Sequence, residues 1–420
     1  MNLFAKAIEK DNLGKDVEFV PTYDTGLDLL NYRNGRIEDN KTLLGIDAGK
    51  IITIMGKPGT GKSTLAIQIA KNIVDQSDNE NSGIIHFDFE RATNKARLEV
   101  LTGWSKDKLK EKYKVLNDGI SSESFYKTVK ALAKIKTEHE DELAVDSGKI
   151  DSNGNPIMIL PPTVVINDSW KTMQPQNMID SKDVSGSMSG GAVAKLNNQI
   201  INILNGILFS ANIILIIVNH ITAKIEIGPV HTKADLNYLK PNESFPGGTS
   251  AMFLSNVLIK LQASTNLEPD KDLGIKGFIS QAQLIKSRSN AAGYKFELVY
   301  DQEFGFDNIL TNFWTLKKAG YLKGNGRAYY FSANPDCKFT QKTFKERYLE
   351  DKKLQKATND TLFPLLEDML SNKNSEMNEV DEEDDGAELE LVKKIKGDIW
   401  LATDNNKYHY NEEDGTITPV

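Results

Sequence analysis

The sequence contains almost no cysteine and no long, uninterrupted apolar run. Cys337 is the one cysteine among 420 residues, so a disulfide within the chain is excluded and a reducing compartment is expected. Residues 1–6 do not begin the apolar core of a signal peptide. The most apolar stretch, residues 200–221, predicts an amphipathic helix and then a buried strand rather than a membrane span, because five polar residues interrupt it (Asn202, Asn205, Ser210, Asn212 and Asn219). We therefore expect a cytoplasmic protein that binds no membrane.

The net negative charge of the chain comes from one short segment. The chain has a net charge of −8, and nine acidic residues with no lysine or arginine lie between Glu376 and Glu390, which leaves +1 for the rest of the chain. Such a segment is usually a solvated linker, and the alternative is a tail that competes with nucleic-acid phosphates for a basic groove. The acidic balance therefore does not exclude a nucleic-acid partner.

The most informative motif is the run Gly56-Lys57-Pro58-Gly59-Thr60-Gly61-Lys62-Ser63-Thr64, which matches the phosphate-binding pattern GxxxxGK[ST] at every fixed position. A strand-like apolar run, residues 51–55, precedes it, and a helical pattern follows it. The glycines let backbone N–H groups turn toward phosphates, while Lys62 supplies a positive charge and Ser63 offers a hydroxyl ligand to Mg²⁺. We therefore expect the chain to bind a nucleoside triphosphate and Mg²⁺.

Strand and helix patterns alternate from about residue 19 to residue 307, which predicts an α/β fold with a mostly parallel sheet flanked by helices. The predicted strands are Ile51–Met55, Gly83–Phe89, Thr163–Asn167, Ile213–Val218 and Val257–Ala263, with an antiparallel extension at Phe278–Lys286 and Tyr294–Tyr300. We divide the chain into a docking segment (1–20), a core (21–307) with a surface insertion (138–162), a small α+β C-terminal domain (308–371), and an acidic linker with a C-terminal extension (372–420).

Polar side chains follow three of the predicted strands, where an open parallel sheet binds its ligands. Glu90 ends the run Asp88-Phe89-Glu90 and fits the general base that activates water for hydrolysis. Asp168 follows an apolar strand and fits a magnesium-holding carboxylate. His220 follows Asn219 at the next strand end, where a polar group can sense the γ-phosphate. Each signal alone is weak, since such residues are more often caps or structural groups.

Taken in order, these motifs resemble the RecA-type recombinases, most of all the phage UvsX branch, over roughly residues 19–370. The resemblance also includes the pair Gly247-Gly248, the motif Lys286-Ser287-Arg288 and the stretch from Phe313 to Tyr321. It implies a RecA-like P-loop ATPase core whose subunits form a helical filament on DNA and bind ATP between neighbours. It further implies that Lys62, Ser63 and Asp168 hold the phosphates and Mg²⁺, that Glu90 activates water, and that His220 senses the γ-phosphate.

The resemblance assigns further roles near the nucleotide and at the subunit contact. Lys286 and Arg288 would reach the ATP of the neighbouring subunit. Asn94 and Arg97 stand where members of the family contact adenine, although Arg97 replaces the usual aromatic residue. The apolar residues of the docking segment, Leu3, Phe4, Ala7 and Ile8, would pack on the adjacent subunit.

Two polar, glycine-rich segments, about 171–195 and 222–249, are expected to bind DNA. Their lysines would neutralise phosphates and their glycine N–H groups would donate to phosphate oxygens; these residues are Gly190, Gly191, Lys195, Lys224, Lys233, Lys240, Gly247 and Gly248. Because few aromatic residues accompany them, we expect non-specific, salt-sensitive binding.

We therefore expect a DNA-dependent ATPase of DNA recombination, repair and replication that coats single-stranded DNA and exchanges strands with double-stranded DNA. Single-strand-binding and loader proteins are candidate partners, and a phage origin would place the protein in the host cytoplasm. One alternative is a hexameric RecA-fold motor such as a replicative helicase, for which residues 1–20 are short as an N-terminal domain. Another is a nucleotide-gated DNA-binding scaffold without hydrolysis.

Overall fold

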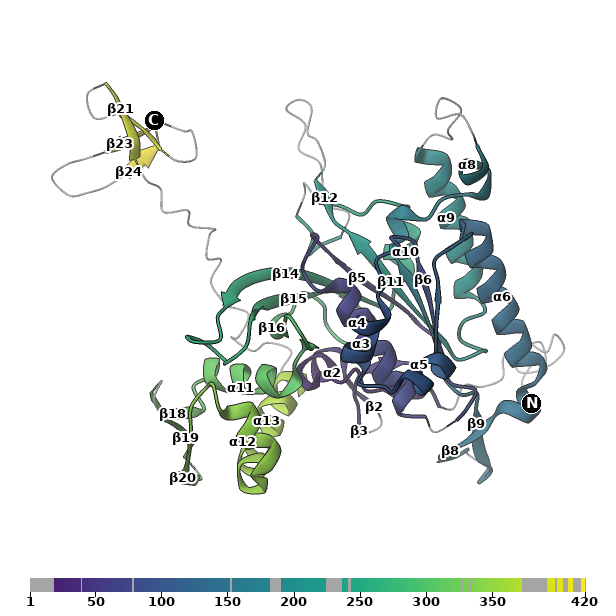
Figure 1. The fold of residues 1–420 in the computed structure, drawn as a ribbon, viewed down its shortest axis with the longest axis horizontal. Helices are drawn as coiled ribbons and strands as arrows, with labels where there is room; N and C mark the ends of the chain where they lie inside the picture. The colour runs from purple at the N-terminus through teal and green to yellow at the C-terminus, as the bar shows by residue number, and fades with distance from the viewer. Residues whose placement is uncertain are drawn as a thin grey trace, which may run out of the picture. The chain divides into compact units, whose positions relative to one another are not determined.

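A nine-stranded, mostly parallel sheet forms the centre of the fold (Figure 1). The computed structural model describes residues 19–371, except 39, 78, 152, 182–189, 224–235, 241–242, 326–327 and 333, together with four strands between 391 and 419. Six neighbouring strands are parallel, and three antiparallel strands extend one side. In spatial order the strands are β17 (Gly305–Phe306), β16 (Lys295–Asp301), β15 (Gly277–Ser287), β14 (Val257–Leu267), β5 (Ile51–Gly56), β11 (Ile213–His220), β10 (Thr163–Asp168), β6 (Gly83–Asp88) and β7 (Tyr113–Leu116).

The predicted α/β class is confirmed, and the sequence explains why these strands lie in the middle. Every residue of β5 and β10 is buried, and only the last residue of β11 is partly exposed. Strands covered on both faces need continuous β-branched and apolar runs, which these three strands have. The seven predicted strands all form, and the boundaries differ slightly; β11 extends two residues further, through His220, because Asn219 and His220 stay paired with β5.

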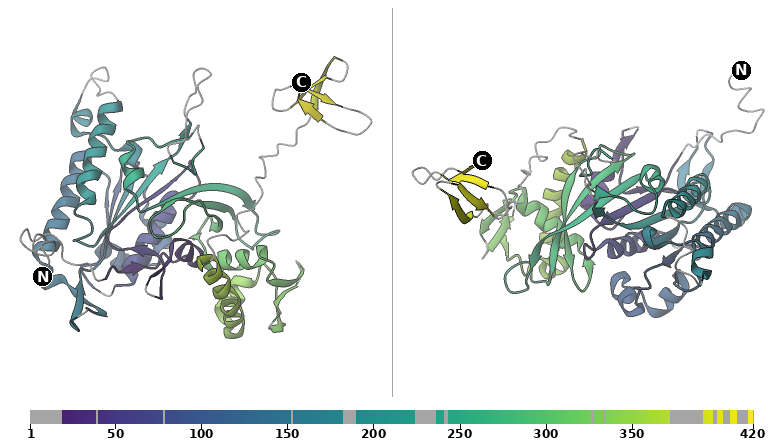
Figure 2. Two further views of the ribbon diagram at one scale, coloured as in Figure 1. Left: turned by 180° about the vertical axis from the view of Figure 1, so that it is seen from behind. Right: turned by 90° about the horizontal axis from the view of Figure 1, so that it is seen from above.

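Helices cover both faces of the sheet and create two hydrophobic cores (Figure 2). One core lies beneath α3 (Lys62–Asp75), α4 (Lys95–Thr102) and α5 (Lys106–Lys112). The other lies beneath α6 (Ser122–Glu138), α9 (Gly190–Asn205) and α10 (Ser250–Leu254). Alternate residues of β5 enter the two cores, as the period of a strand requires: Ile52 and Ile54 face α3, whereas Ile51 and Met55 face α6 and α9.

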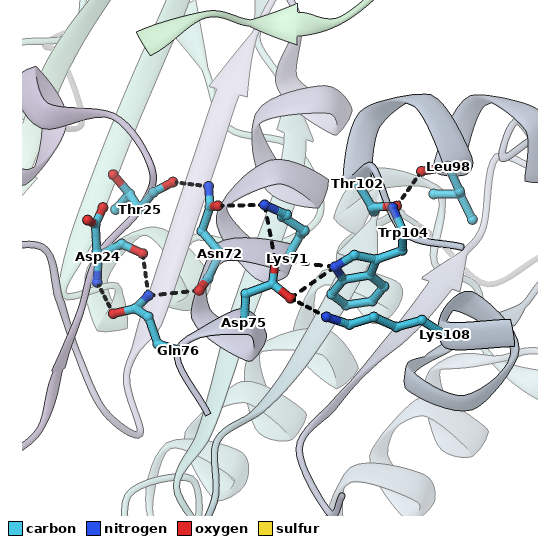
Figure 3. Close-up of polar contacts among 10 residues, drawn as sticks. All are labelled: Asp24, Thr25, Lys71, Asn72, Asp75, Gln76, Leu98, Thr102, Trp104 and Lys108. Carbon is cyan, nitrogen blue, oxygen red and sulfur yellow. Dashed lines mark hydrogen bonds and ion pairs between the residues drawn. The ribbon is translucent and has the colours of Figure 1, made fainter. Parts of the chain in front are cut away.

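The C-terminal end of α3 is hydrogen-bonded to the segments on both sides of it (Figure 3). The Asp75 carboxylate accepts hydrogen bonds from the Trp104 indole at 3.0 Å and from the Lys108 ammonium at 2.7 Å. On the other side, the amide of Asn72 donates to the Thr25 carbonyl at 2.8 Å. The helix that follows the Gly56–Thr64 loop is therefore fixed at its far end.

Four short antiparallel pairs surround the sheet. They are β1 (Thr22–Tyr23) with β4 (Ile46–Asp47), β2 (Arg36–Glu38) with β3 (Lys41–Leu43), β8 (Val145–Ile150) with β9 (Pro156–Ile159), and β12 (Thr222–Ala223) with β13 (Glu243–Ser244). Segment 138–162 contains the β8–β9 pair, whose residues are half-buried or exposed, and the short helix α7 (Glu140–Leu143). The remaining short helices are α2 (Asp28–Asn34), the 3₁₀ turn η1 (Trp170–Thr172) and α8 (Gln176–Asp180).

Residues 308–371 form helices and a small three-stranded sheet. The elements are α11 (Asn308–Lys318), β18 (Leu322–Asn325), β19 (Ala328–Phe331), β20 (Asn334–Phe339), α12 (Phe344–Glu350) and α13 (Lys352–Ser371). The hairpin predicted between Tyr321 and Tyr330 is present as β18 and β19, and β20 adds a third strand. Phe313, Phe344 and Leu366 belong to the same hydrophobic cluster as Leu29 and Leu30 of α2, so this region shares a core with the sheet.

Residues 374–420 form a separate unit. It contains an antiparallel meander of β21 (Leu391–Lys396), β22 (Ile399–Ala402), β23 (Lys407–Tyr410) and β24 (Ile417–Pro419). The acidic run 376–390 and the apolar residues of segment 1–18 lie outside the described residues. Within the described part of the chain, no helix has both the length and the apolar composition needed to cross a membrane.

Candidate functional site

The Gly56–Thr64 loop joins the end of β5 to the start of α3 at the carboxyl edge of the sheet. Gly59 and Gly61 adopt φ angles of 78° and 88°, which residues other than glycine rarely adopt. A Cβ atom at Gly61 would lie 2.9 Å from the Phe306 ring, so the close packing of this turn also requires glycine. The first N–H groups of α3 have no partner within the helix.

Lys62 is the buried charge of this loop. Its side chain is only 6% exposed, and its ammonium donates to the Lys57 carbonyl at 2.8 Å, which also accepts from the Thr60 hydroxyl at 2.9 Å. Burial lowers the pKa of Lys62, and the carboxylates of Asp168 and Glu90 oppose that effect. The loop therefore holds a cation in a site that disfavours uncompensated charge, which suits an anionic ligand.

Strand pairing brings three of the predicted residues to the same edge. His220 pairs with Gly56, and Asp168 pairs with both Val218 and Asp88 across the parallel sheet. Glu90 follows β6 by two residues, and the neighbouring Phe89 N–H donates to the Asp168 carbonyl at 2.7 Å, which holds this turn against β10. The predicted convergence of strand ends is therefore present.

Glu90 is held by two donors from the neighbouring strands. Its Oε1 atom accepts from the Ser169 hydroxyl at 2.6 Å and lies 2.9 Å from Nε2 of His220. Burial by itself raises the pKa of Glu90, but these two hydrogen bonds and the charges of His220 and Lys62 outweigh it, so the pKa lies below its usual value. Glu90 is thus ionised near neutral pH and can accept a proton.

Asp168 and Ser63 are in direct contact. The Ser63 hydroxyl donates to the buried Asp168 carboxylate. The pKa of Asp168 is raised to about 6, chiefly by burial and further by the charges of Glu90 and Asp88, while the Ser63 hydrogen bond and the charge of Lys62 oppose the rise. These two side chains place two oxygen ligands beside the loop. No group of three or more His, Cys, Asp or Glu side chains suited to a metal occurs among the described residues.

Ser169 is a residue of this site that the sequence analysis missed. It directly follows Asp168 and is fully buried. A serine at the end of a strand has no distinctive pattern, and its hydrogen bond to Glu90 joins residues 79 positions apart. Only the side-by-side arrangement of β6 and β10 brings the two together.

Asn94 and Arg97 occupy structural positions on α4. Asn94 caps the helix by accepting from the Ala96 N–H at 2.8 Å, and Arg97 donates to the Glu303 carbonyl in the turn between β16 and β17. Tyr300, from the end of β16, packs against Phe306 beside Gly61 and lies 3.5 Å from the Thr64 hydroxyl. The aromatic surface next to the loop therefore comes from Tyr300, the last residue of a predicted strand, and from Phe306, to which the sequence assigns no role.

Lys286 and Arg288 lie at the opposite edge of the sheet from the loop of their own chain. The Arg288 N–H donates to the Asn256 carbonyl, and the Asn256 N–H donates to the carbonyl of Ile51, the first residue of β5. Five residue steps along β5 separate Ile51 from Gly56, or about 16 Å. Both side chains donate to the Phe253 carbonyl at the end of α10. Burial lowers the pKa of Lys286, and the charge of Arg288 lowers it further.

The predicted DNA-binding residues are distributed over several elements. Gly190 and Gly191 begin α9, which also carries Lys195, so the helix starts within the first predicted loop. Lys224 and Lys233 lie outside the described residues, and Lys240 is exposed. Gly247 and Gly248 form a turn with φ angles of 90° and 109°.

This Gly247–Gly248 turn, which belongs to the second predicted DNA-binding segment, contacts the residues on either side of the first. The Gly247 carbonyl accepts from the Trp170 indole at 2.9 Å, and a Cβ atom at Gly248 would lie 2.5 Å from Oδ1 of Asn198 in α9. The Asn219 amide donates to the Pro246 carbonyl at 2.8 Å, which links the turn to the end of β11. The turn thus contacts the strand that ends in His220.

A second contact fixes the same segment to the sheet. Lys260 of β14 forms an ion pair with Glu243 of β13 at 2.6 Å, and both side chains are largely buried. A buried charge that loses its partner is costly, so this pair defines where β13 lies.

Comparisons with known proteins add nothing to this geometry, because no model of a protein family matches the chain and no curated protein matches it significantly. The functional assignment therefore depends on the residues and contacts described above.

Proposed function

We propose that the chain is a DNA-dependent ATPase of the RecA type, which assembles as a helical filament on single-stranded DNA and promotes homologous pairing and strand exchange. The observation that supports this most is the meeting of four elements at one sheet edge: the Gly56–Thr64 loop, Glu90, the Ser63–Asp168 pair and His220. The mostly parallel central sheet flanked by helices is compatible with a RecA-like core, which supports the proposal.

In this proposal the loop binds the phosphates of ATP. Its backbone N–H groups and the start of α3 face the phosphates, and Lys62 exchanges its bond to the Lys57 carbonyl for one to a phosphate oxygen. Ser63 and Asp168 would hold Mg²⁺, which suits an ion that takes one or two protein ligands and completes its shell with phosphates and water. The bound ion would neutralise charge on the phosphates.

Hydrolysis would depend on Glu90. Its pKa, held below the usual value by Ser169 and His220, leaves the carboxylate ready to accept a proton from the attacking water. His220, the last residue of β11, contacts the Glu90 side chain, and the residue before it, Asn219, donates to the Pro246 carbonyl beside the Gly247–Gly248 turn. A γ-phosphate that drew His220 away from Glu90 would therefore change the base and the DNA-binding segment together.

The position of Lys286 and Arg288 favours an assembly. These cations cannot serve the loop of their own chain from the far edge of the sheet. In a filament the same cations would face the neighbouring copy and stabilise the charge that develops during phosphoryl transfer. Such a head-to-tail contact produces an open helix when the rotation between copies does not close.

The test is imaging of the full chain with single-stranded DNA and a slowly hydrolysed ATP analogue, together with ATPase measurements. We expect helical filaments and hydrolysis that DNA stimulates, and strand exchange between single-stranded DNA and a homologous duplex. Six-membered rings with duplex unwinding would instead identify a hexameric motor. Filaments without hydrolysis would identify a nucleotide-gated scaffold.

A further inference from the structure

Ser169 gives Glu90 a fixed hydrogen-bond donor. The side chain of Ser169 is fully buried, and its hydroxyl lies 2.6 Å from Oε1 of Glu90. The second donor, His220, is partly exposed and stands at the end of β11. The two donors approach from different strands, and the buried one makes the shorter contact.

Both donors reach the same oxygen of Glu90. The Ser169 hydroxyl and Nε2 of His220 contact Oε1, at 2.6 Å and 2.9 Å. Within the described residues no donor reaches the other oxygen, Oε2. A carboxylate fixed through one oxygen keeps the lone pairs of its second oxygen available and aimed in one direction.

The hydroxyl of Ser169 does not cap its own turn, and it makes its shorter contact with Glu90, at 2.6 Å, and a longer one with the Thr172 hydroxyl, at 3.2 Å. Ser169 is the residue before the 3₁₀ turn η1, yet its side chain makes no capping hydrogen bond there. The turn is instead closed by Thr172, whose N–H and hydroxyl both donate to the Ser169 carbonyl, at 3.1 Å and 2.9 Å. The Ser169 carbonyl therefore holds the turn, while the Ser169 hydroxyl is left to bind Glu90 and, more weakly, the Thr172 hydroxyl.

We propose that Ser169 is a positioning residue for hydrolysis, which fixes Glu90 through Oε1 and so directs Oε2 at the attacking water. The inference depends on the proposed ATPase function. It assigns the proton to Oε2 of Glu90, and it makes Ser169 act through Glu90 rather than on ATP. Misorienting a reacting group by about 1 Å can reduce a rate about 100-fold, which sets the scale of the expected effect.

The experiment compares Ser169→Ala with Ser280→Ala in the full chain on single-stranded DNA, measuring single-turnover ATP hydrolysis and the Kd of ATP separately. Ser169→Ala is expected to lower the hydrolysis rate about 10- to 100-fold while the Kd changes less than about twofold. Ser280→Ala removes a hydroxyl on β15 that is also fully buried but does not touch Glu90 or Ser169, and it is expected to hydrolyse ATP as the unchanged chain does.

A double variant tests whether Ser169 acts through Glu90. In the Glu90→Gln background, Ser169→Ala is expected to reduce the residual rate no further, since the group it orients is already absent. The inference is overturned by wild-type hydrolysis in Ser169→Ala, by a weaker Kd with an unchanged rate, or by equal losses in Ser169→Ala and Ser280→Ala. If Glu90→Gln itself hydrolyses normally, the proposed function fails as well, which distinguishes the two failures.

Discussion

Nε2 of His220 lies 2.9 Å from Oε1 of Glu90, so these two side chains meet across the end of β10, which separates their strands in the sheet. The contact joins the predicted base to the strand that leads, through Asn219 and Pro246, to the Gly247–Gly248 turn. Glu90 is therefore the point where a change in His220 would affect hydrolysis directly.

The first prediction concerns Glu90 itself. Glu90→Gln keeps the shape of the side chain and its acceptor for Ser169, but it removes the base, so ATP turnover should fall about 100- to 10,000-fold. Binding of ATP and of single-stranded DNA should be retained, as measured by fluorescence titration. The matched control is Glu99→Gln on α4, where the carboxylate has no partner in the site; a comparable loss in that control would remove Glu90 from its role.

A second prediction tests whether Arg288 acts on a neighbouring copy. Arg288→Ala and Glu90→Gln should each lose DNA-stimulated hydrolysis alone. In an equal mixture, an interface is complete when the Arg288→Ala copy supplies the loop and Glu90 and the Glu90→Gln copy supplies Arg288. Activity should therefore return at up to about a quarter of the interfaces. The control mixes Glu90→Gln with Lys62→Ala, whose defects lie on the same side of the contact. If hydrolysis returns in that control, or fails to return in the first mixture, Arg288 does not act across the interface.

A third prediction concerns the buried lysine of α6. The ammonium of Lys136 donates to the Pro161 carbonyl at 2.6 Å and to the Thr163 hydroxyl at 2.9 Å, and burial lowers its pKa from 10.5 to about 7. Between these two values the unfolded chain binds more protons than the folded one, so stability should increase as the pH rises from 7 to 10.

The size of this effect follows from the same shift. Relative to Lys136→Met, the unchanged chain should gain roughly 3 kcal/mol in its free energy of unfolding between pH 7 and pH 10. Urea denaturation of both proteins at several pH values measures the difference, and the other titrating groups cancel in the comparison. Parallel pH profiles for the two proteins would show that Lys136 stays protonated in the fold.

The sequence predicts the parts of this structure that are encoded locally. The glycines and the lysine of the Gly56–Thr64 loop act over nine adjacent residues, and the continuous apolar runs of β5, β10 and β11 indicate burial on both faces. The placing of Glu90, Asp168 and His220 at one edge follows from the parallel arrangement of their strands.

What the sequence does not predict depends on neighbours in space. The Ser169 hydroxyl, the packing of Tyr300 and Phe306 beside Gly61, and the Lys260–Glu243 pair join residues far apart in the chain. No local pattern marks any of them, because each depends on which strand lies beside which. The start of α9 at Gly190 also differs from the loop expected there, since glycine is tolerated at the first position of a helix.

The last prediction concerns Gly248, which lies where the two predicted DNA-binding segments meet. Its φ angle is 109°, and an added Cβ atom would lie 2.5 Å from Oδ1 of Asn198 and 2.9 Å from the Ala194 carbonyl of α9. Gly248→Ala should therefore displace the turn, weaken binding of single-stranded DNA several-fold, and leave ATP binding without DNA intact.

Gly103→Ala provides the control, because Gly103 also has a positive φ, 64°, but no atom within 4 Å of an added Cβ. Both variants place an alanine at a positive φ, which costs roughly 1–2 kcal/mol, and only Gly248→Ala adds a collision with α9. Salt-dependent titration of both variants with single-stranded DNA measures the difference, and equal affinities would show that this turn does not position the DNA-binding segments.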